Sequence, residues 1–483
     1  NLNGGTVEAT GGTNFNWGQY VVESTVTVAG SSTSTITADL RFRDTSTVNV
    51  GVTGDPSGVD LLMSGKVGHI NNVSWGYMNK SGAGTLKITG PMEIGGINLS
   101  AGKLILEDAG ADWAVNSTGL NNNAQVEVSV PSGSRTLQVG IYGGGSLVKT
   151  GAGTLTLTAV NSYSGGTTVN AGTLVLQANS GQARVGGVLT VNSGATVETT
   201  GDGTGLGFYD QLTTLNVNGG TATSAGVMHV WNLTGGVNLT GATLQSNGGV
   251  STASGSQLEW NRTSVNTLAS AIPSTIGGRI NIRGDNGYTT VDLTVADGAA
   301  ATDLAITAAI TEAAGGRGIA KHGPGTMVLS GNNSYSGATT VNEGLVIVQN
   351  GNGIGNLSNV TLNNSSQLRL DANESVGSLA GSATSTVNIQ SHTLQLGSQL
   401  GSATATYDGV ISGTGALVRR GGGTQTLTGN NSFSGSITVQ DGGTLSVPTV
   451  AASGNQPLGV GTGNISLDGS GGGATLAITG AGT

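Results

Sequence analysis

The chain has no cysteine among its 483 residues, and proline, aromatic and charged residues are scarce. Without cysteine there is no disulfide, no thiolate metal site and no cysteine nucleophile. Charged residues make up 9% of the chain and the formal net charge is −9, so no nucleic-acid partner is expected. No apolar run approaches the roughly 20 residues of a membrane helix, so we expect no membrane insertion by this region.

Recognisable targeting and cofactor signals are also missing. No signal peptide is visible, and both ends of the sequence look cut from the middle of a repeat, so we expect the native polypeptide to be longer. The glycine-rich stretches are not followed by a phosphate-loop lysine, and the four histidines stand far apart with different neighbours. The sequence therefore predicts no catalytic residue, no metal site and no cofactor.

Glycine is abundant, with 87 residues against 7 prolines. The absence of a three-residue period excludes collagen. Val, Leu and Ile recur in alternation with Thr, which argues against disorder and indicates short strands. Short strands separated by glycine turns predict an all-β protein.

One pattern occurs four times. In residues 146–177, two alternating runs, Thr154–Thr158 and Gly172–Leu176, each follow a glycine turn, and a Tyr-Ser-Gly-Gly corner lies between them. From Lys149 to Gln177 is 28 positions, and from Lys321 to Gln349 is 28 again. The copies lie near residues 77–106, 146–177, 319–349 and 416–447.

Strand–turn units that recur about every 20 residues predict a β-solenoid, in which each rung is one turn of the chain. At the spacing of paired strands, this length would form about 22 rungs and a rod roughly 100 Å long. We expect irregular rungs over residues 1–60 and a continuous solenoid over 61–483. The Ala-rich stretch Asp303–Ala314 could form a helix, but its apolar residues do not keep to one helical face, which favours strand.

The pattern Lys-x-Gly-x-Gly-Thr-Leu, followed by Asn-x-Tyr-Ser-Gly, resembles the passenger-associated transport repeat, also called the autotransporter-associated β-strand repeat. The first copy lacks the Tyr-Ser-Gly corner. The resemblance implies a right-handed parallel β-helix in a large bacterial protein that is secreted or displayed at the cell surface. The corner residues expected to serve the structure are Lys149, Gly151, Gly153, Tyr163, Gly165, Lys321, Gly323, Gly325, Tyr335, Gly337, Gly421, Gly423, Phe433 and Gly435.

A basic residue occupies one position in every copy. The four residues are Lys80, Lys149, Lys321 and Arg419. Since long basic side chains commonly lay their stems on apolar surface, we expect these stems to lie over the rung surface with the charge in water.

Three local features could carry a function. Arg283-Gly284-Asp285 is the integrin-recognition tripeptide, but tripeptides occur by chance and a polar turn between strands is the favoured interpretation. The acidic zone Asp285, Asp292, Asp297 and Asp303, with Arg279 and Arg283, could form a glycan-cleaving site or be solvated loops. Trp231 and Trp260 could stack on sugars, but buried packing is the commoner use of tryptophan.

We therefore predict a non-catalytic extracellular rod, which serves as the structural or adhesive stalk or passenger region of a large bacterial surface or secreted protein. One alternative is a subunit of a polymerised extracellular filament or sheath. Another is a polysaccharide-degrading β-helix enzyme. The corresponding partners are a host-cell, glycan or matrix surface, or further copies of the chain joined end to end.

Overall fold

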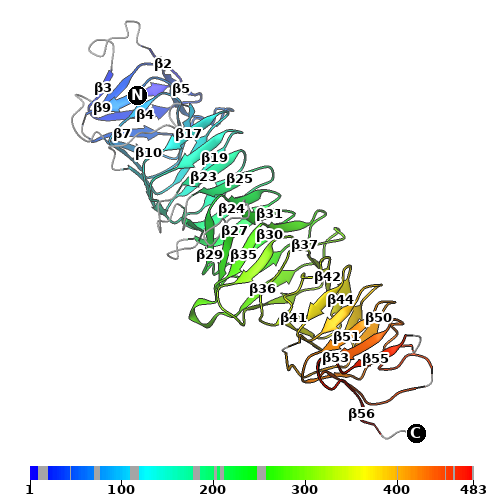
Figure 1. Cartoon of the computed structure of the whole chain (residues 1–483). Helices are drawn as coiled ribbons and strands as arrows, with labels where there is room; N and C mark the ends of the chain where they lie inside the picture. Colours follow the sequence, from blue (N-terminus) through cyan, green and yellow to red (C-terminus); the bar gives the residue numbers. More distant parts are fainter. Residues whose placement is uncertain are drawn as a thin grey trace. The chain divides into compact units, whose positions relative to one another are not determined.

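The computed structural model describes residues 1–8, 20–43, 45–69, 77–108, 119–177, 185–200, 204–206, 212–246, 257–399, 401–451, 453–460 and 463–480. These residues form short strands that pair in parallel with strands of neighbouring rungs (Figure 1). Among them, Asp285–Gly287 forms the 3-10 turn η3. No helix in this part of the chain is long and apolar enough to span a membrane. The predicted all-β parallel solenoid is confirmed.

The chain divides into two compact units, residues 1–235 and 236–483. In unit 1, one ladder contains a strand from every rung, and we call it the central face. The face whose strand comes just before it in the rung is the leading face, and the face whose strand comes just after it is the trailing face.

The strands of unit 1 are assigned to these faces as follows. The central face contains β2 (Thr6–Val7), β5 (Ser34–Ile36), β8 (Leu61–Met63), β11 (Thr85–Ile88), β14 (Lys103–Glu107), β16 (Gln125–Ser129), β19 (Ser146–Thr150), β22 (Thr167–Val169), β24 (Gly187–Val191) and β27 (Leu212–Asn218). The leading face contains β1 (Leu2–Asn3), β4 (Thr25–Ala29), β7 (Thr45–Val50), β10 (Tyr77–Ser81), β13 (Gly96–Leu99), β15 (Gly119–Asn122), β18 (Ile141–Gly143) and β21 (Ser162–Tyr163), then β26 (Thr204–Leu206) and β29 (Val227–Trp231). The trailing face contains β3 (Tyr20–Val22), β6 (Leu40–Phe42), β9 (Val67–His69) and β12 (Met92–Glu93), then β17 (Ser134–Leu137), β20 (Thr154–Leu157), β23 (Thr173–Gln177), β25 (Thr196–Thr200) and β28 (Thr221–Ser224).

Unit 2 repeats this plan. Its central face contains β30 (Val237–Thr240), β33 (Val265–Thr267), β36 (Thr290–Val295), β39 (Gly318–His322), β41 (Thr339–Val341), β43 (Asn359–Leu362), β46 (Ser378–Gly381), β49 (Ala405–Tyr407), β52 (Thr424–Leu427), β54 (Thr444–Val447) and β56 (Thr475–Ile478). The trailing face contains β31 (Thr243–Ser246), β34 (Ser274–Gly277), β37 (Leu304–Ile306), β40 (Thr326–Leu329), β42 (Leu345–Val348), β44 (Gln367–Leu370), β47 (Thr386–Asn388) and β50 (Val410–Ser412). The leading face contains β32 (Gln257–Asn261), β35 (Arg279–Ile282) and β38 (Ala309–Glu312), then β45 (Glu374–Val376), β48 (Leu394–Leu396), β51 (Leu417–Arg420), β53 (Ile437–Gln440) and β55 (Ile465–Asp468).

The Ala-rich stretch Asp303–Ala314 forms β37 and β38, so the strand interpretation is confirmed. Its apolar residues Leu304, Ile306 and Ile310 are all buried. Side chains of successive strand residues point to opposite faces, so this spacing buries all three within strands.

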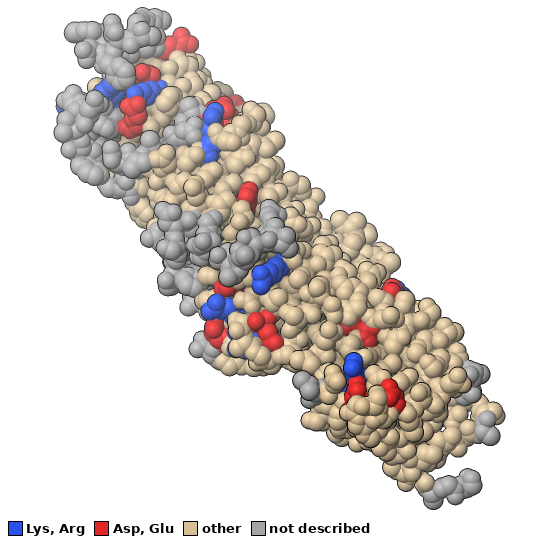
Figure 2. Space-filling view, in the orientation of Figure 1, with Lys and Arg blue, Asp and Glu red and all other residues tan. Residues whose placement is uncertain are grey.

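The core forms because alternating residues stack on their counterparts in the next rung. On the trailing face of unit 1, Leu155 pairs with Leu174, which pairs with Val197, and all three are fully buried. Burying a side chain of this size contributes roughly 2 kcal/mol. Outward positions in the same strands carry mainly Thr, and Figure 2 shows how thinly charged side chains are spread over one side of the surface.

Candidate functional site

The lysine of the second repeat copy lies inside the solenoid. Lys149, on β19, has no exposed surface, and its Nζ donates hydrogen bonds to the carbonyl oxygens of Thr150 (2.8 Å), Gly151 (2.8 Å) and Ala171 (3.1 Å). The first two carbonyls belong to the corner of its own rung and the third to the corner of the next rung. Our prediction that this charge lies in water is therefore wrong, because backbone carbonyls take the place of water around the ammonium group.

The lysines of the first and third copies are held in the same way. Lys80 donates to Ser81, Gly82 and Ala101 at 3.1, 2.7 and 2.9 Å. Lys321 donates to the carbonyls of His322, Gly323 and Glu343 at 3.3, 2.6 and 2.9 Å. Both side chains are fully buried.

Burial lowers the pKa of Lys80, Lys149 and Lys321 to about 8. The carboxylate of Asp60 partly opposes the shift at Lys80, and those of Glu343 and Asp303 oppose it at Lys321. The carbonyl oxygens also favour the charged form, because they accept hydrogen bonds from it. All three lysines are therefore mainly cations at neutral pH.

In the fourth copy, an arginine occupies this position and contacts three rungs. Arg419, on β51, donates from Nη1 to the carbonyl of Leu396 (3.1 Å) in the preceding rung and that of Arg420 (2.9 Å) in its own. Its Nε approaches the carbonyl of Thr444 (3.4 Å) in the following rung. A Cβ at Gly397 would lie 2.2 Å from Nη1, so this glycine makes room for the larger guanidinium group.

The basic residues do not all lie at the same corner of the solenoid. In unit 1, Lys80 is the penultimate residue of a strand of the leading face, whereas Lys149 is the penultimate residue of a strand of the central face. In unit 2, Lys321 lies on the central face and Arg419 on the leading face. Of the four repeat cations, each unit therefore has one on its leading face and one on its central face.

The glycines expected at the repeat corners lie close to the backbone of the preceding rung. Gly151, Gly323, Gly421 and Gly423 have φ of +77°, +77°, +78° and +78°. Backbone atoms of the preceding rung would lie within 3 Å of a Cβ at every corner glycine named above, namely Gly151, Gly153, Gly165, Gly323, Gly325, Gly337, Gly421, Gly423 and Gly435.

The aromatic residue of the corner is buried in all three copies that have it. The hydroxyl of Tyr163 lies 2.5 Å from that of Thr167, and the hydroxyl of Tyr335 lies 2.8 Å from that of Thr339. Burial raises the pKa of both tyrosines. In the fourth copy, Phe433 stands at the tyrosine position, and the residue four positions later is the buried apolar Ile437. The fourth copy thus has two apolar residues where the other two copies have a hydrogen-bonded tyrosine and threonine.

This difference between the copies predicts that the stability effects of substitutions at Tyr163 and Thr167 are coupled. Tyr163→Phe should destabilise unit 1 by about 1–3 kcal/mol, because it leaves the buried Thr167 hydroxyl without its tyrosine partner. The double variant Tyr163→Phe/Thr167→Val removes both polar groups at nearly constant volume and should be within about 1 kcal/mol of the wild type. Urea unfolding of the wild type, both single variants and the double variant tests this; additive effects would contradict it.

The repeat asparagine, absent from the corner residues predicted above, connects successive rungs. Asn333 accepts a hydrogen bond from the backbone N–H of Ile310 (2.7 Å) and donates to the carbonyl of Gly353 (2.6 Å), one rung before and one rung after it. In the other copies, Asn161 accepts from Ile141 at 2.8 Å, and Asn431 accepts from Ile411 at 2.7 Å. The recurrence of this asparagine in the Asn-x-Tyr-Ser-Gly pattern is the sequence signal that could have pointed to its structural role.

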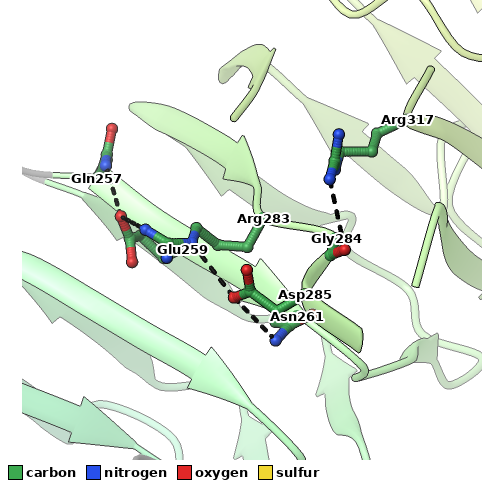
Figure 3. A network of polar contacts seen from close by, with 7 residues as sticks. All are labelled: Gln257, Glu259, Asn261, Arg283, Gly284, Asp285 and Arg317. Carbon is green, nitrogen blue, oxygen red and sulfur yellow. Dashed lines mark hydrogen bonds and ion pairs between the residues drawn. The ribbon is translucent and has the colours of Figure 1, made fainter. Parts of the chain in front are cut away.

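The Arg283-Gly284-Asp285 tripeptide follows β35 and forms a turn (Figure 3). Arg283 Nε lies 3.4 Å from the Asp285 carboxylate, and its Nη1 lies 3.5 Å from that of Glu259 in the preceding rung. Asn261 donates to Asp285 at 3.4 Å. The side chains of Arg283 and Asp285 are 35% and 42% exposed, so their two charges face each other at the surface.

Other aspartates of the acidic zone have separate partners. Asp303 is buried and accepts 2.8 Å hydrogen bonds from the backbone N–H groups of Gly298 and Thr326. Its carboxylate therefore serves to hold the backbone of two segments in place. Asp292 lies 3.3 Å from the ring of His322, and both are about half exposed. Within the described ranges, no three His, Asp or Glu side chains are placed to hold a metal ion.

Of the two tryptophans, Trp260 is buried in the core of unit 2, and its indole N–H donates to the carbonyl of Thr263 at 2.7 Å. The packing interpretation is therefore confirmed for Trp260. Trp231 stacks on His229 in unit 1, with ring centroids 4.6 Å apart.

This fold, with a buried cation at recurring glycine corners, defines a repeat-built parallel β-solenoid. The family model of the passenger-associated-transport-repeat matches residues 147–176, 319–348 and 417–447. The chain therefore contains three passenger-associated transport repeats, at three of the four predicted places. The fourth place, near residues 77–106, lies outside these matches, although Lys80 makes the same type of contacts.

One curated relative is the "Adhesin BmaC autotransporter" of Brucella suis biovar 1 (strain 1330). It is 29% identical over 256 residues, which cover 44% of this chain and 7% of the relative. The chain thus spans only a small part of that relative's length. No solved structure matches the chain.

Proposed function

We propose that this chain is part of a non-catalytic passenger of a bacterial surface or secreted protein, with a structural and adhesive role. The observation that supports it best is the coincidence of the three family matches with the corners that hold Lys149, Lys321 and Arg419. Repeats of passenger proteins are thus integral to the fold of this chain. The relative's name, an autotransporter adhesin, favours the adhesive role.

Two measurements test this proposal. Intact cells that express the native gene should lose the segment to added protease, and beads coated with the purified chain should bind host cells, matrix proteins or glycans above beads coated with a non-adhesive protein. Retention inside the cell, or absence of binding to every surface tested, would contradict the proposal.

Release of reducing sugar from a polysaccharide panel, abolished by Asp292→Asn, would favour the enzyme alternative. Continuous fibres of uniform width in electron micrographs of native material would favour the filament alternative.

The Arg283-Gly284-Asp285 turn is the ligand contact that we propose for this surface. Since the Arg283–Asp285 pair is 3.4 Å apart and its side chains are 35% and 42% exposed, breaking this one contact for a partner costs about 1 kcal/mol or less. Asp285→Glu keeps the charge but displaces the carboxylate, and we expect it to reduce host-cell binding at least about tenfold. The matched control is Asp297→Glu, also at an exposed aspartate of unit 2, which should bind as the wild type does. Equal binding by the wild type and both variants would exclude the turn as the contact.

A further inference from the structure

The strands of this solenoid are nearly interchangeable. Leu155-Thr156-Leu157 of β20 lies on Leu174-Val175-Leu176 of β23, and similar alternation continues from rung to rung. Because side chains alternate with a period of two, a slip of two residues returns every apolar side chain to the core. Hydrophobic burial alone therefore discriminates poorly between the observed register and one shifted by two residues.

The buried lysines do discriminate between these registers. Lys149 pairs with Val169 of the next rung and donates to the carbonyl of Ala171, two residues further on. The same offset of two residues recurs in the other two copies. There, Lys80 pairs with Leu99 and donates to Ala101, and Lys321 pairs with Val341 and donates to Glu343.

A slip of two residues would break this contact. It would move the Ala171 carbonyl by about 7 Å along the strand, beyond hydrogen-bond reach of Lys149 Nζ. The ammonium group would keep the two carbonyls of its own corner but lose the third inside a buried site. A buried charge that loses a hydrogen-bond partner costs more free energy than an apolar side chain in the same place.

We infer that the buried lysines of the repeats set the register between their own rung and the next one. This inference goes beyond the proposed surface role and does not depend on it. It gives a physical reason for placing a costly buried cation at intervals along a chain of similar strands, since buried polar groups can select one alignment among several of similar hydrophobic energy.

A glycine at the same corner is the competing explanation. Gly172, next to Ala171, has φ of +65°, and a Cβ there would lie 2.4 Å from the carbonyl oxygen of Gly153. A slipped rung would bring a residue with a Cβ to this place. A variant that removes the lysine but keeps the glycine separates the two explanations.

The absence of cysteine allows the register to be measured by cross-linking. Val148 and Thr168 are direct partners on β19 and β22, so cysteines there report the native register. Cysteines at Val148 and Asn170 report a slip of two residues. Both pairs are introduced into the full chain, with Lys149 retained or replaced in Lys149→Met, and the chains are refolded from denaturant and then oxidised.

With Lys149 present, the native pair should form a disulfide and the slipped pair should not. In Lys149→Met, the ratio of native to slipped cross-link should fall by about tenfold or more, which corresponds to the loss of one hydrogen bond to a charged group. The control is Lys103→Met, which removes a partly exposed lysine on β14, separated from β19 by β16 on the same face, and should leave the ratio unchanged. An unchanged ratio in Lys149→Met would reject the inference and leave Gly172 as the register-setting residue.

A second variant covers the case in which Lys149→Met fails to fold. Lys321→Met is tested with cysteines at Ala320 and Thr340, which are direct partners, and at Ala320 and Asn342, which report the slip. The same fall in the ratio supports the inference. If neither lysine variant regains β-structure by circular dichroism, the lysines supply stability and not register, and the inference is rejected.

Discussion

Gly172→Ala is expected to destabilise unit 1 by more than about 3 kcal/mol, because the new Cβ meets two separate penalties. The residue has φ of +65°, a left-handed conformation that costs an L-residue roughly 1–2 kcal/mol. The Cβ would also lie 2.4 Å from the carbonyl oxygen of Gly153 and 2.5 Å from that of Gly151. Both are backbone atoms of the preceding rung, so the overlap can be relieved only by separating the rungs.

Gly194→Ala separates these two penalties. Gly194 lies in the same unit and has φ of +75°, but no atom lies within 4 Å of its Cβ position. We expect this variant to lose only about 1 kcal/mol. Urea unfolding followed by circular dichroism compares the two, and hydrogen exchange in residues 147–176 locates the damage. Equal urea midpoints would show that the close approach of the rungs contributes nothing.

Glu374 should make unit 2 less stable as the pH rises from about 4.5 to about 8. The side chain is only 3% exposed, and burial raises the pKa of its carboxyl group from 4.5 to about 8, although the backbone N–H groups of Ile354 and Gly353 donate to it. Between these two values, the folded chain binds a proton that the unfolded chain has released. Stability therefore falls with rising pH, by on the order of 4 kcal/mol across this interval.

Glu374→Gln removes this dependence, because an amide does not ionise. At pH 9, the variant should be more stable than the wild type by a few kcal/mol, and at pH 4 the two should differ by about 1 kcal/mol or less. Urea midpoints measured from pH 4 to pH 9 test this. Glu23→Gln, whose carboxylate in unit 1 is 59% exposed, serves as the control and should keep the wild-type slope. A parallel pH profile for Glu374→Gln and wild type would contradict the prediction.

The lysines act in a different pH range and with the opposite sign. Since burial lowers the pKa of Lys80, Lys149 and Lys321 to about 8, the unfolded chain binds more protons than the folded chain from about pH 8 to about 10.5. Their contribution to stability therefore increases with pH in that range. The Glu374 effect is complete below it, so the two contributions can be measured separately.

The repeat shows where reasoning from sequence succeeded and where it failed. The period-two alternation around Leu155 and Leu174 is a local property of the strand, so it was enough to predict strands, buried positions and a solenoid. The buried state of Lys149 was missed, because a long basic side chain can either reach water or turn inward. Which of these occurs depends on the carbonyl of Ala171, some twenty residues later in the chain.

For the candidate ligand contact as well, the residues could be found from the sequence but their contacts could not. The tripeptide Arg283-Gly284-Asp285 is visible in the sequence, but the contacts of its charges with Glu259 and Asn261 come from the preceding rung. Likewise, the four aspartates of the acidic zone look like a cluster in sequence, whereas the structure gives Asp303 and Asp292 different partners.

By itself, the sequence determined that this chain forms a parallel β-solenoid with recurring glycine corners, because alternation and turn residues are encoded within a few neighbouring residues and the repeat spacing can be read along the chain. Only the tertiary structure decided which corner each repeat occupies, and that its cation lies inside. Those properties depend on how many residues separate successive corners, and on which carbonyl of the next rung then comes within reach of the cation.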